Sequence, residues 1–225
     1  MGKRKKLTAQ DKRDILEKNL NFYNEKIKIN ENSLFFGVDG SIQRPGFCLL
    51  DSKGGVVEMF HLKTKGANDK KRLIEIGNVF ENVIKEYPEI ALVAFEDVVV
   101  RKFFTAMKKL AMVYGACLSR CPTYHIGFTP TQLKKSATGN GKAEKEDVMR
   151  VLEEKFGLTF KTDDESDAYC AARLAYLLSF YNQIFQESDS TMDFLKFKDS
   201  YSMTSFEFEA LSVTLQSKSF YDQNH

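Results

Sequence analysis

The stretch Leu34-Phe35-Phe36-Gly37-Val38-Asp39 is the clearest structural signal in this chain of 225 residues. A short apolar run of this length is typical of a strand that is buried on both faces. The run ends on an acid, and the turn residues Gly40 and Ser41 follow it. It therefore predicts a buried strand that delivers the Asp39 carboxylate to one edge of a sheet.

Around this strand, residues 33–185 alternate between strand and helix patterns. A β-meander comes first, with Lys53-Gly54-Gly55 as a turn, and βα units follow. Pro88 ends one helix and Gly157 is the expected C-cap of another. The other predicted strands are 46–50, 56–62, 90–95 and 124–128, and the predicted helices are 72–87, 103–119, 143–156 and 165–181. This order predicts an α/β fold with a mixed five-stranded sheet flanked by helices.

The two ends of the chain differ from this middle region. The first 30 residues hold nine Lys or Arg against four Asp or Glu, and Thr8 and Asp11 fit the start of a helix. Residues 186–225 hold three basic against seven acidic residues and show no period, so we expect a poorly ordered tail or a partner-binding arm. We therefore predict a basic N-terminal extension (1–32), a central α/β domain (33–185) and a polar Ser- and Phe-containing tail (186–225).

Composition excludes several classes of protein. The chain is 43% hydrophobic and 28% charged, which is ordinary for a soluble globular protein. No apolar run approaches the ~18 residues that span a membrane, and the basic start lacks the apolar stretch of a secretory signal. The four cysteines form no C-x-x-C pair, which favours buried thiols in a reducing compartment over a zinc site. We expect a soluble intracellular protein without a membrane partner.

Four acids stand at positions that such a fold can bring together. Asp39 and Glu96 each end an apolar strand, whereas Asp164 and Asp167 lie three residues apart at the start of the last predicted helix. That spacing places both on one helical face. Clustered carboxylates repel one another unless a divalent cation lies among them. The pattern favours two magnesium ions that would serve phosphodiester hydrolysis.

Each acid also has an ordinary structural explanation. Asp39 before Gly40 suits a turn, and Glu96-Asp97 suits a solvated strand end. The run Asp163-Asp164-Glu165 complements the positive end of a helix dipole. The combination of two acid-terminated strands with a D-x-x-D helix start favours the metal site.

Four segments of the chain resemble RuvC-type Holliday junction resolvases. That family carries G-I/V-D before a short loop and G-F/Y, then an acid-bearing strand, then P-x-x-x-K with T/V-G-x-G-x-A-x-K, and finally D-E-A-D-A. The matching segments are Phe36 to Ser41 with Pro45-Gly46-Phe47, Val93 to Asp97, Thr129 to Lys145 (T-P-T-Q-L-K-K-S-A-T-G-N-G-K-A-E-K), and Asp164 to Ala168. Their order and spacing agree with the family over about 33–181.

The resemblance implies a ribonuclease-H-like fold and a homodimer that cleaves four-way DNA junctions with magnesium, or with manganese as a substitute. The implied metal ligands are Asp39, Glu96, Asp164 and Asp167. Lys134 and Lys145 match two family lysines beside the scissile phosphate, where they would hold it and offset developing charge; without the motif, both would be ordinary surface lysines. The extensions at both ends suit a phage, a large DNA virus or a mobile element.

Basic residues flank the four acids and predict a phosphate-neutralising surface. Solvated helix faces explain two of them, Lys108 and Lys109, equally well. Many family members place an aromatic residue three positions after the second-strand acid, where this chain has Val99, so a phenylalanine one turn later is the expected substitute. The predicted DNA contacts are Arg101, Lys102, Phe103, Phe104, Lys135 and Lys142.

For the homodimer we expect helix 103–119 as the interface. Small residues would permit close approach and larger apolar ones would supply surface; the alternative is that this helix only covers the sheet. The small residues are Ala106, Ala111, Gly115 and Ala116, and the larger ones are Met107, Met112 and Tyr114.

Three other functions fit parts of the pattern. A branch-binding module without catalysis would not need all four acids. An ATP-dependent phosphotransferase of the actin-like or sugar-kinase type is suggested by 37–41, but it needs two such subdomains and this chain has room for one. Another ribonuclease-H-like nuclease, for RNA processing or transposition, fits the G-N-G-K-A-E-K segment less well.

Overall fold

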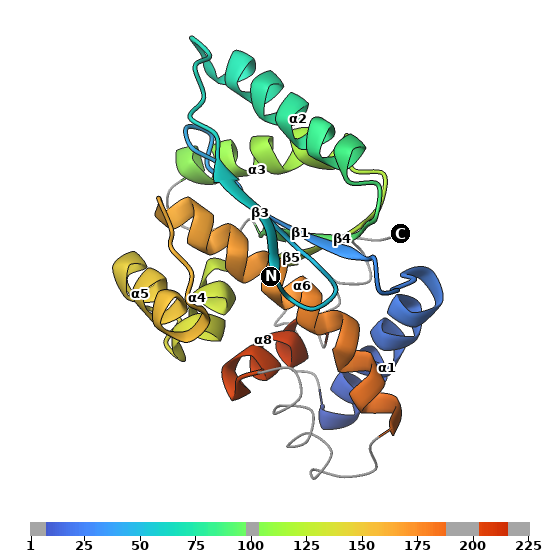
Figure 1. The fold of residues 1–225 in the computed structure, drawn as a ribbon. Coiled ribbons are helices and arrows are strands. Elements are labelled where there is room, and N and C mark those ends of the chain that lie inside the picture. Colours follow the sequence, from blue (N-terminus) through green and yellow to red (C-terminus); the bar gives the residue numbers. More distant parts are fainter. Residues whose placement is uncertain (1–7, 98–103, 188–202, 216–225) are drawn as a thin grey trace, which may run out of the picture.

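The computed structural model describes residues 8–97, 104–187 and 203–215. In this part of the chain, a five-stranded sheet lies between two layers of helices (Figure 1). The strands are β1 (Leu34–Asp39), β2 (Gly46–Leu50), β3 (Val56–His61), β4 (Ile90–Glu96) and β5 (Tyr124–Phe128). The helices are α1 (Ala9–Lys26), α2 (Asp69–Glu86), α3 (Phe104–Leu118), α4 (Pro130–Thr138), α5 (Lys145–Phe156), α6 (Asp163–Glu187) and α8 (Ser205–Leu215). None of these described helices is long and apolar enough to cross a membrane.

The sheet has the mixed topology that the sequence predicts. Its strand order is β3-β2-β1-β4-β5. The meander β1–β2–β3 is antiparallel, whereas β4 runs parallel to both β1 and β5. In the parallel β1–β4 pair, Val38 lies opposite Phe95. The two strands therefore end side by side, and the acids that follow, Asp39 and Glu96, reach the same edge of the sheet.

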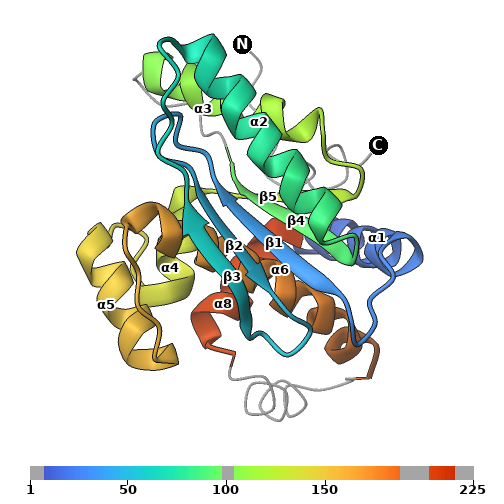
Figure 2. The ribbon, with the colours of Figure 1, turned by 45° about the horizontal axis from the view of Figure 1, so that its top comes forward.

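The core has one apolar layer on each face of the sheet (Figure 2). Under α2 and α3, the rings of Phe36 and Phe80 stack with centroids 5.5 Å apart, and Phe95 stacks on Phe80 at 6.0 Å. The other face is covered by α6, with α4, α5, α8 and α1 around it (Figures 1 and 2). The middle of α6 is buried on all sides, as expected of a helix that is apolar all round.

Two glycines allow α6 to lie very close to the sheet. A Cβ atom on Gly37 of β1 would overlap the Ala168 carbonyl and the Ala172 backbone, and a Cβ on Gly46 of β2 would overlap the backbone of Asp164. Close helix–sheet packing of this kind leaves no space for a side chain at either glycine. The first turns of α6 are thereby pressed against the end of β1 that carries Asp39.

The N-terminal segment contributes to the core. Thr8 caps α1 through the reciprocal hydrogen bonds with Asp11 that the sequence predicts. Leu16 and Tyr23 are buried, and the ring of Phe22 meets Tyr124 of β5 edge-on at 5.8 Å. The described part of the basic extension is therefore packed on the domain that follows it.

The expectation of poor order is wrong for residues 205–215, which form α8. Its Glu207 is buried and paired with Arg173 of α6. From the sequence alone, both charged residues would be expected at the surface. Glu207 also accepts hydrogen bonds from the backbone and hydroxyl of Thr204, which begins the helix. Thr214 accepts a hydrogen bond of 2.7 Å from Gln132 of α4. α8 is thus joined to both α6 and α4.

The sequence prediction also missed α4, at 130–138. No helix was predicted for this segment, yet its start has a capping box between Thr129 and Gln132 with Pro130 in the first turn. Both are known helix-start signals. At the other end, Gly139 adopts a left-handed φ of 79°, which only glycine adopts readily.

We predict that Leu211→Ala in α8 lowers the free energy of unfolding by about 2–5 kcal/mol, because Leu211 is fully buried and its loss leaves a cavity. Urea denaturation of the full chain measures this. Val213 on the same helix is 53% exposed, so Val213→Ala is the matched control and should change stability by less than about 0.5 kcal/mol. Equal, small effects would mean that α8 does not stabilise the fold.

Candidate functional site

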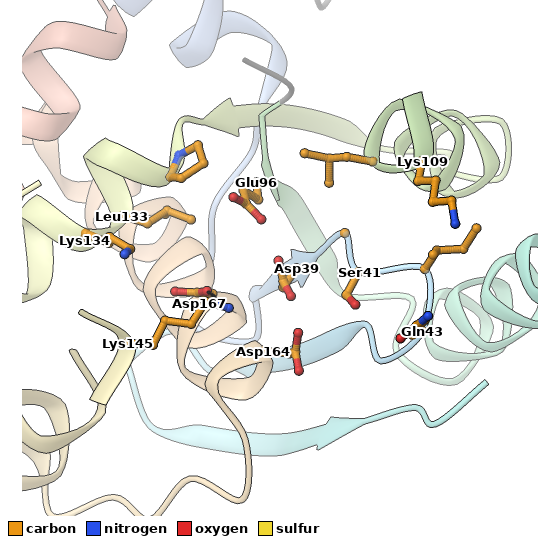
Figure 3. A pocket seen from close by; sticks show the side chains of 14 residues that line it. Asp39, Ser41, Gln43, Glu96, Lys109, Leu133, Lys134, Lys145, Asp164 and Asp167 are labelled. Carbon is orange, nitrogen blue, oxygen red and sulfur yellow. Dashed lines mark ion pairs between the residues drawn. The ribbon is translucent and has the colours of Figure 1, made fainter. Parts of the chain in front are cut away.

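The four predicted acids line one cavity of about 430 Å³ at the carboxyl ends of β1 and β4 (Figure 3). Asp39 and Glu96 come from the strand ends, and Asp164 and Asp167 come from the first turns of α6. The same cavity is lined by both predicted phosphate lysines, Lys134 and Lys145, and by residues that sequence analysis did not single out. These further residues are Gly40, Ser41, Ile42, Gln43, Leu110, Pro130 and Leu133. Lys109 of α3, one of the basic residues expected to flank the acids, also lines the cavity.

Burial and mutual repulsion perturb the acids. The pKa of Asp39 is raised well above its ordinary range, first because its carboxyl is buried and then because Glu96 shares a hydrogen bond and negative charge with it. Burial, followed by the charge of Glu96, raises the pKa of Asp167 to about 7 even though Lys145 and Lys134 oppose the shift. Two carboxyls of this site therefore resist ionisation unless positive charge is brought to them.

Basic side chains of the protein supply part of that charge. Arg44, in the β1–β2 loop, donates from Nε to Asp164 and from Nη2 to Asp163 at 2.6 Å. Lys145, at the start of α5, pairs with Asp163, and its Nζ lies 3.9 Å from Asp167. Burial disfavours the charged Lys145, but the hydrogen bond to Asp163 and the charge of Asp167 outweigh it and raise its pKa to about 12.

The segment between α4 and α5 positions the two lysines. Lys134, on α4, donates from Nζ to the Ala143 carbonyl at 2.6 Å. The turn that connects the helices is closed by Thr138, whose hydroxyl accepts from the backbone of Asn140 at 3.1 Å. The G-N-G-K-A-E-K motif therefore forms a short turn between α4 and α5. Lys134 and Lys145, one on each of these helices, lie on one wall of the cavity (Figure 3).

The carboxylates do not form a preformed metal cage. Among the residues that the structure describes, no three Asp, Glu, His or Cys side chains are arranged so that they could hold one ion. The physical reason is visible in the ion pairs: Asp164 is bonded to Arg44, and Asp167 lies beside Lys145. The predicted ligands thus share one cavity, but two of them face cations of the protein.

The predicted DNA contacts have different outcomes. Lys142 is exposed in the turn before α5, whereas Lys135 is paired with Glu209 of α8 at 2.6 Å. Arg101, Lys102 and Phe103 lie outside the described residues, as does the side chain of Phe104, where α3 begins. Arg44 was missed, because no local spacing connects it to an acid 120 residues away.

The order of the mixed sheet, with carboxylates at the ends of two adjacent parallel strands and at the start of α6, defines the ribonuclease-H-like class of nuclease folds. The family model described as "Crossover junction endodeoxyribonuclease RuvC" matches residues 35–174. The chain therefore belongs to the RuvC family. The match runs from β1 to the first half of α6, and leaves α1 and α8 outside it.

Individual relatives agree with this assignment. RuvC of Sulfurovum sp. is 32% identical over 145 residues, which are 60% of this chain and 90% of that protein. RuvC of Caldicellulosiruptor saccharolyticus is 27% identical over 168 residues, or 68% of this chain and 97% of that protein. Both are named crossover junction endodeoxyribonucleases.

Solved structures share the fold. The structure titled "T. thermophilus RuvC in complex with Holliday junction substrate" has a TM-score of 0.56 and 21% identity, covering 68% of this chain and 97% of that chain. The yeast mitochondrial Holliday junction resolvase Ydc2 has a TM-score of 0.52 and 12% identity, covering 82% and 92%. The expected ribonuclease-H-like architecture is thereby confirmed.

We predict that Asp167→Asn stabilises the protein in EDTA at pH 8, by on the order of 1–2 kcal/mol, and less at pH 5. Its folded pKa of about 7 exceeds the unfolded value of about 3.9. The ionised carboxylate therefore destabilises the fold above pH 7, and this penalty disappears as pH falls through 7 towards 3.9. Urea denaturation at both pH values measures the difference. Glu146→Gln on the exposed surface of α5 is the control, and a loss of stability at pH 8 would contradict the prediction.

Proposed function

We propose that this chain is a structure-selective endonuclease that resolves four-way DNA junctions by paired, metal-dependent cleavage of phosphodiesters. The observation that carries this proposal is the convergence of Asp39, Glu96, Asp164 and Asp167 with two lysines on one cavity, within the stretch that matches the RuvC family. The structure of T. thermophilus RuvC, which was solved in complex with a Holliday junction substrate, supports the choice of DNA structure.

The residues present fit a hard divalent cation. All four candidate ligands are carboxylates, and oxygen ligands suit magnesium or manganese better than zinc or copper. Burial first, and then the negative charge of Glu96, raises the pKa of both Asp39 and Asp167. A divalent cation would favour the ionised form of both carboxyls. When bound by Asp39, Glu96, Asp164 and Asp167, magnesium would supply an activated water and stabilise the leaving oxygen.

The lysines of the cavity would hold the phosphate. Lys134 uses one N–H on the Ala143 carbonyl, and an ammonium group has three donors. Lys145 stays protonated because Asp163 and Asp167 favour its charged form. Both are positioned before substrate arrives, so they can offset negative charge as it develops on the phosphate. On the opposite wall, Lys109 and Gln43 would contact the adjoining DNA backbone (Figure 3).

The competing functions receive less support. The described residues contain one mixed sheet, whereas an actin-like phosphotransferase needs two such subdomains. A binding module without catalysis would not require the four acids to meet at one cavity with two lysines. An RNA-processing nuclease or a transposase would share the fold, but the family match favours junction cleavage.

We predict that Asp39→Asn, Glu96→Gln and Asp167→Asn each lower junction cleavage in magnesium by at least about 10²–10³-fold. Junction binding in calcium should stay within about threefold, because it depends on the basic residues and calcium holds the attacking water poorly. The measurement is cleavage and gel-shift binding of a synthetic four-way junction, with Glu146→Gln as the surface control.

The same assay tests substrate choice. A matched linear duplex and an RNA–DNA hybrid are included, each with magnesium and with EDTA. Equal cleavage of the duplex or the hybrid would contradict junction resolution and favour another ribonuclease-H-like nuclease. A residual rate above about a tenth of normal in any acid variant would mean that this acid is not an essential ligand.

We also propose that the active species is a homodimer that uses α3. A junction needs two nicks in opposite strands, and a two-fold dimer presents two identical sites at a fixed separation. Ala111 and Gly115 are exposed on α3, and a Cβ on Gly115 would meet nothing within 4 Å. Tyr114, which was expected to supply apolar surface, is only partly buried. One side of its ring packs within the chain against Phe95 at 4.9 Å and against His125 at 6.2 Å.

We predict that Gly115→Glu converts the dimer to a monomer and lowers paired nicking of the junction. Light scattering should give about twice the chain mass of 25.8 kDa for the wild type and the single mass for the variant. Thr159→Glu, an exposed position before α6, is the control for an added surface charge. A wild-type monomer that makes paired nicks in dilute solution would refute the dimer.

A further inference from the structure

Arg44 bridges two neighbouring carboxylates, one of which, Asp164, lines the acid cavity. Its Nε bonds to Asp164 and its Nη2 bonds to Asp163 at 2.6 Å. The Asp164 side chain is 8% exposed, whereas that of Arg44 is 44% exposed. A solvent-accessible guanidinium thus reaches over a buried carboxylate that lines the cavity.

The backbone that carries Arg44 is held in place. Thr64 donates from its hydroxyl to the Ile42 carbonyl at 3.0 Å and from its backbone to the Gln43 carbonyl at 3.1 Å. Leu62 donates to the Pro45 carbonyl at 2.9 Å. The loop is therefore anchored on both sides of Arg44, so a change in its contacts requires rotation of the side chain alone.

The contact with Asp164 separates Arg44 from the other cations of the site. Lys145 reaches Asp163 and Asp167, and Lys134 reaches a backbone carbonyl. Among the ion pairs of the described residues, the pair with Arg44 is the one that engages Asp164. A charge-assisted hydrogen bond lowers the negative potential of the carboxylate that accepts it. A guanidinium bonded directly to that carboxylate also repels any further cation that approaches it.

We propose that Arg44 is a built-in counter-ion of the acid cavity, which holds Asp164 in the metal-free protein and competes with the divalent cation for that carboxylate. The inference rests on the proposed function, in which Asp164 is a metal ligand. Arg44 then has two effects of opposite sign. It stabilises the cavity when no metal is bound, and it weakens metal binding, because the ion must displace the guanidinium or bind beside it.

The test is to measure the affinity of the full chain for manganese, without DNA, by titration calorimetry. Arg44→Gln should bind manganese at least about tenfold more tightly, which corresponds to the loss of one charge-assisted hydrogen bond. In EDTA the same variant should melt at a lower temperature than the wild type, and manganese should remove that difference. Arg44→Lys keeps the charge but loses the bridging geometry. Its manganese affinity and its melting temperature in EDTA should lie between those of the wild type and of Arg44→Gln.

Arg150→Gln is the matched control. Arg150 also bridges two carboxylates, Asp147 at 3.1 Å and Glu154 at 3.3 Å, but it does so on the exposed surface of α5. Its replacement removes the same formal charge and should leave manganese affinity within about twofold. A tenfold gain in this control as well would mean that net charge, and not the contact with Asp164, sets the affinity, and would overturn the inference.

Asp39→Asn separates failure of the inference from failure of the proposed function. If Arg44→Gln binds manganese as weakly as the wild type, or more weakly, at a site that Asp39→Asn removes, the inference is overturned and the metal site stands. If neither the wild type nor Arg44→Gln binds manganese, or if Asp39→Asn leaves manganese binding unchanged, the proposed metal site is wrong. The inference is then overturned as well.

Discussion

Mutual repulsion among four carboxylates is the constraint to which the rest of this structure responds. Asp39 is fixed at the end of a buried strand and cannot move away from Glu96, because β1 and β4 are hydrogen-bonded in parallel. The other two acids approach on α6. Such a cluster is costly in a cavity that is partly shielded from water, so the protein surrounds it with positive charge from three separate elements: the β1–β2 loop, α4 and α5.

The depth of the site is set by packing and not by polar contacts. The small residues Gly37, Gly46, Ala168 and Ala172 let α6 lie directly on β1 and β2. Larger residues there would lift α6 from the sheet and separate its acids from Asp39. The middle of α6 is buried on every side and mostly apolar, with Arg173 as an exception that pairs with Glu207. The first turn of the same helix is strongly acidic.

Much of this architecture follows from local sequence patterns. The strands, the parallel βα units and the positions of the four acids are encoded by short apolar runs and by acids at their ends, so they could be predicted. The helix α4 has only nine residues, and it was missed although the Thr129–Gln132 capping box marks its start. The helix α8 was missed because Glu207 is buried, and a buried charge cannot be recognised without its partner Arg173.

The contacts that could not be predicted are those that join distant parts of the chain. The bond of Arg44 to Asp164 spans 120 residues, and no periodicity or spacing reports it. The same is true of Tyr114, whose place between Phe95 and His125 depends on how α3 crosses the sheet. The sequence indicated which acids and lysines line the cavity, but not that Arg44 pairs with one of these acids.

The contacts of α8 link the cavity to a helix that contributes no residue to it. α8 supports α4 through Gln132 and Thr214, and its Glu207 pairs with the buried Arg173 of α6. A local opening of α8 would withdraw a carboxylate from the interior and would remove a support of the helix that bears Lys134. The arrangement of the cavity therefore depends on a helix that lies outside the segment matched by the family model.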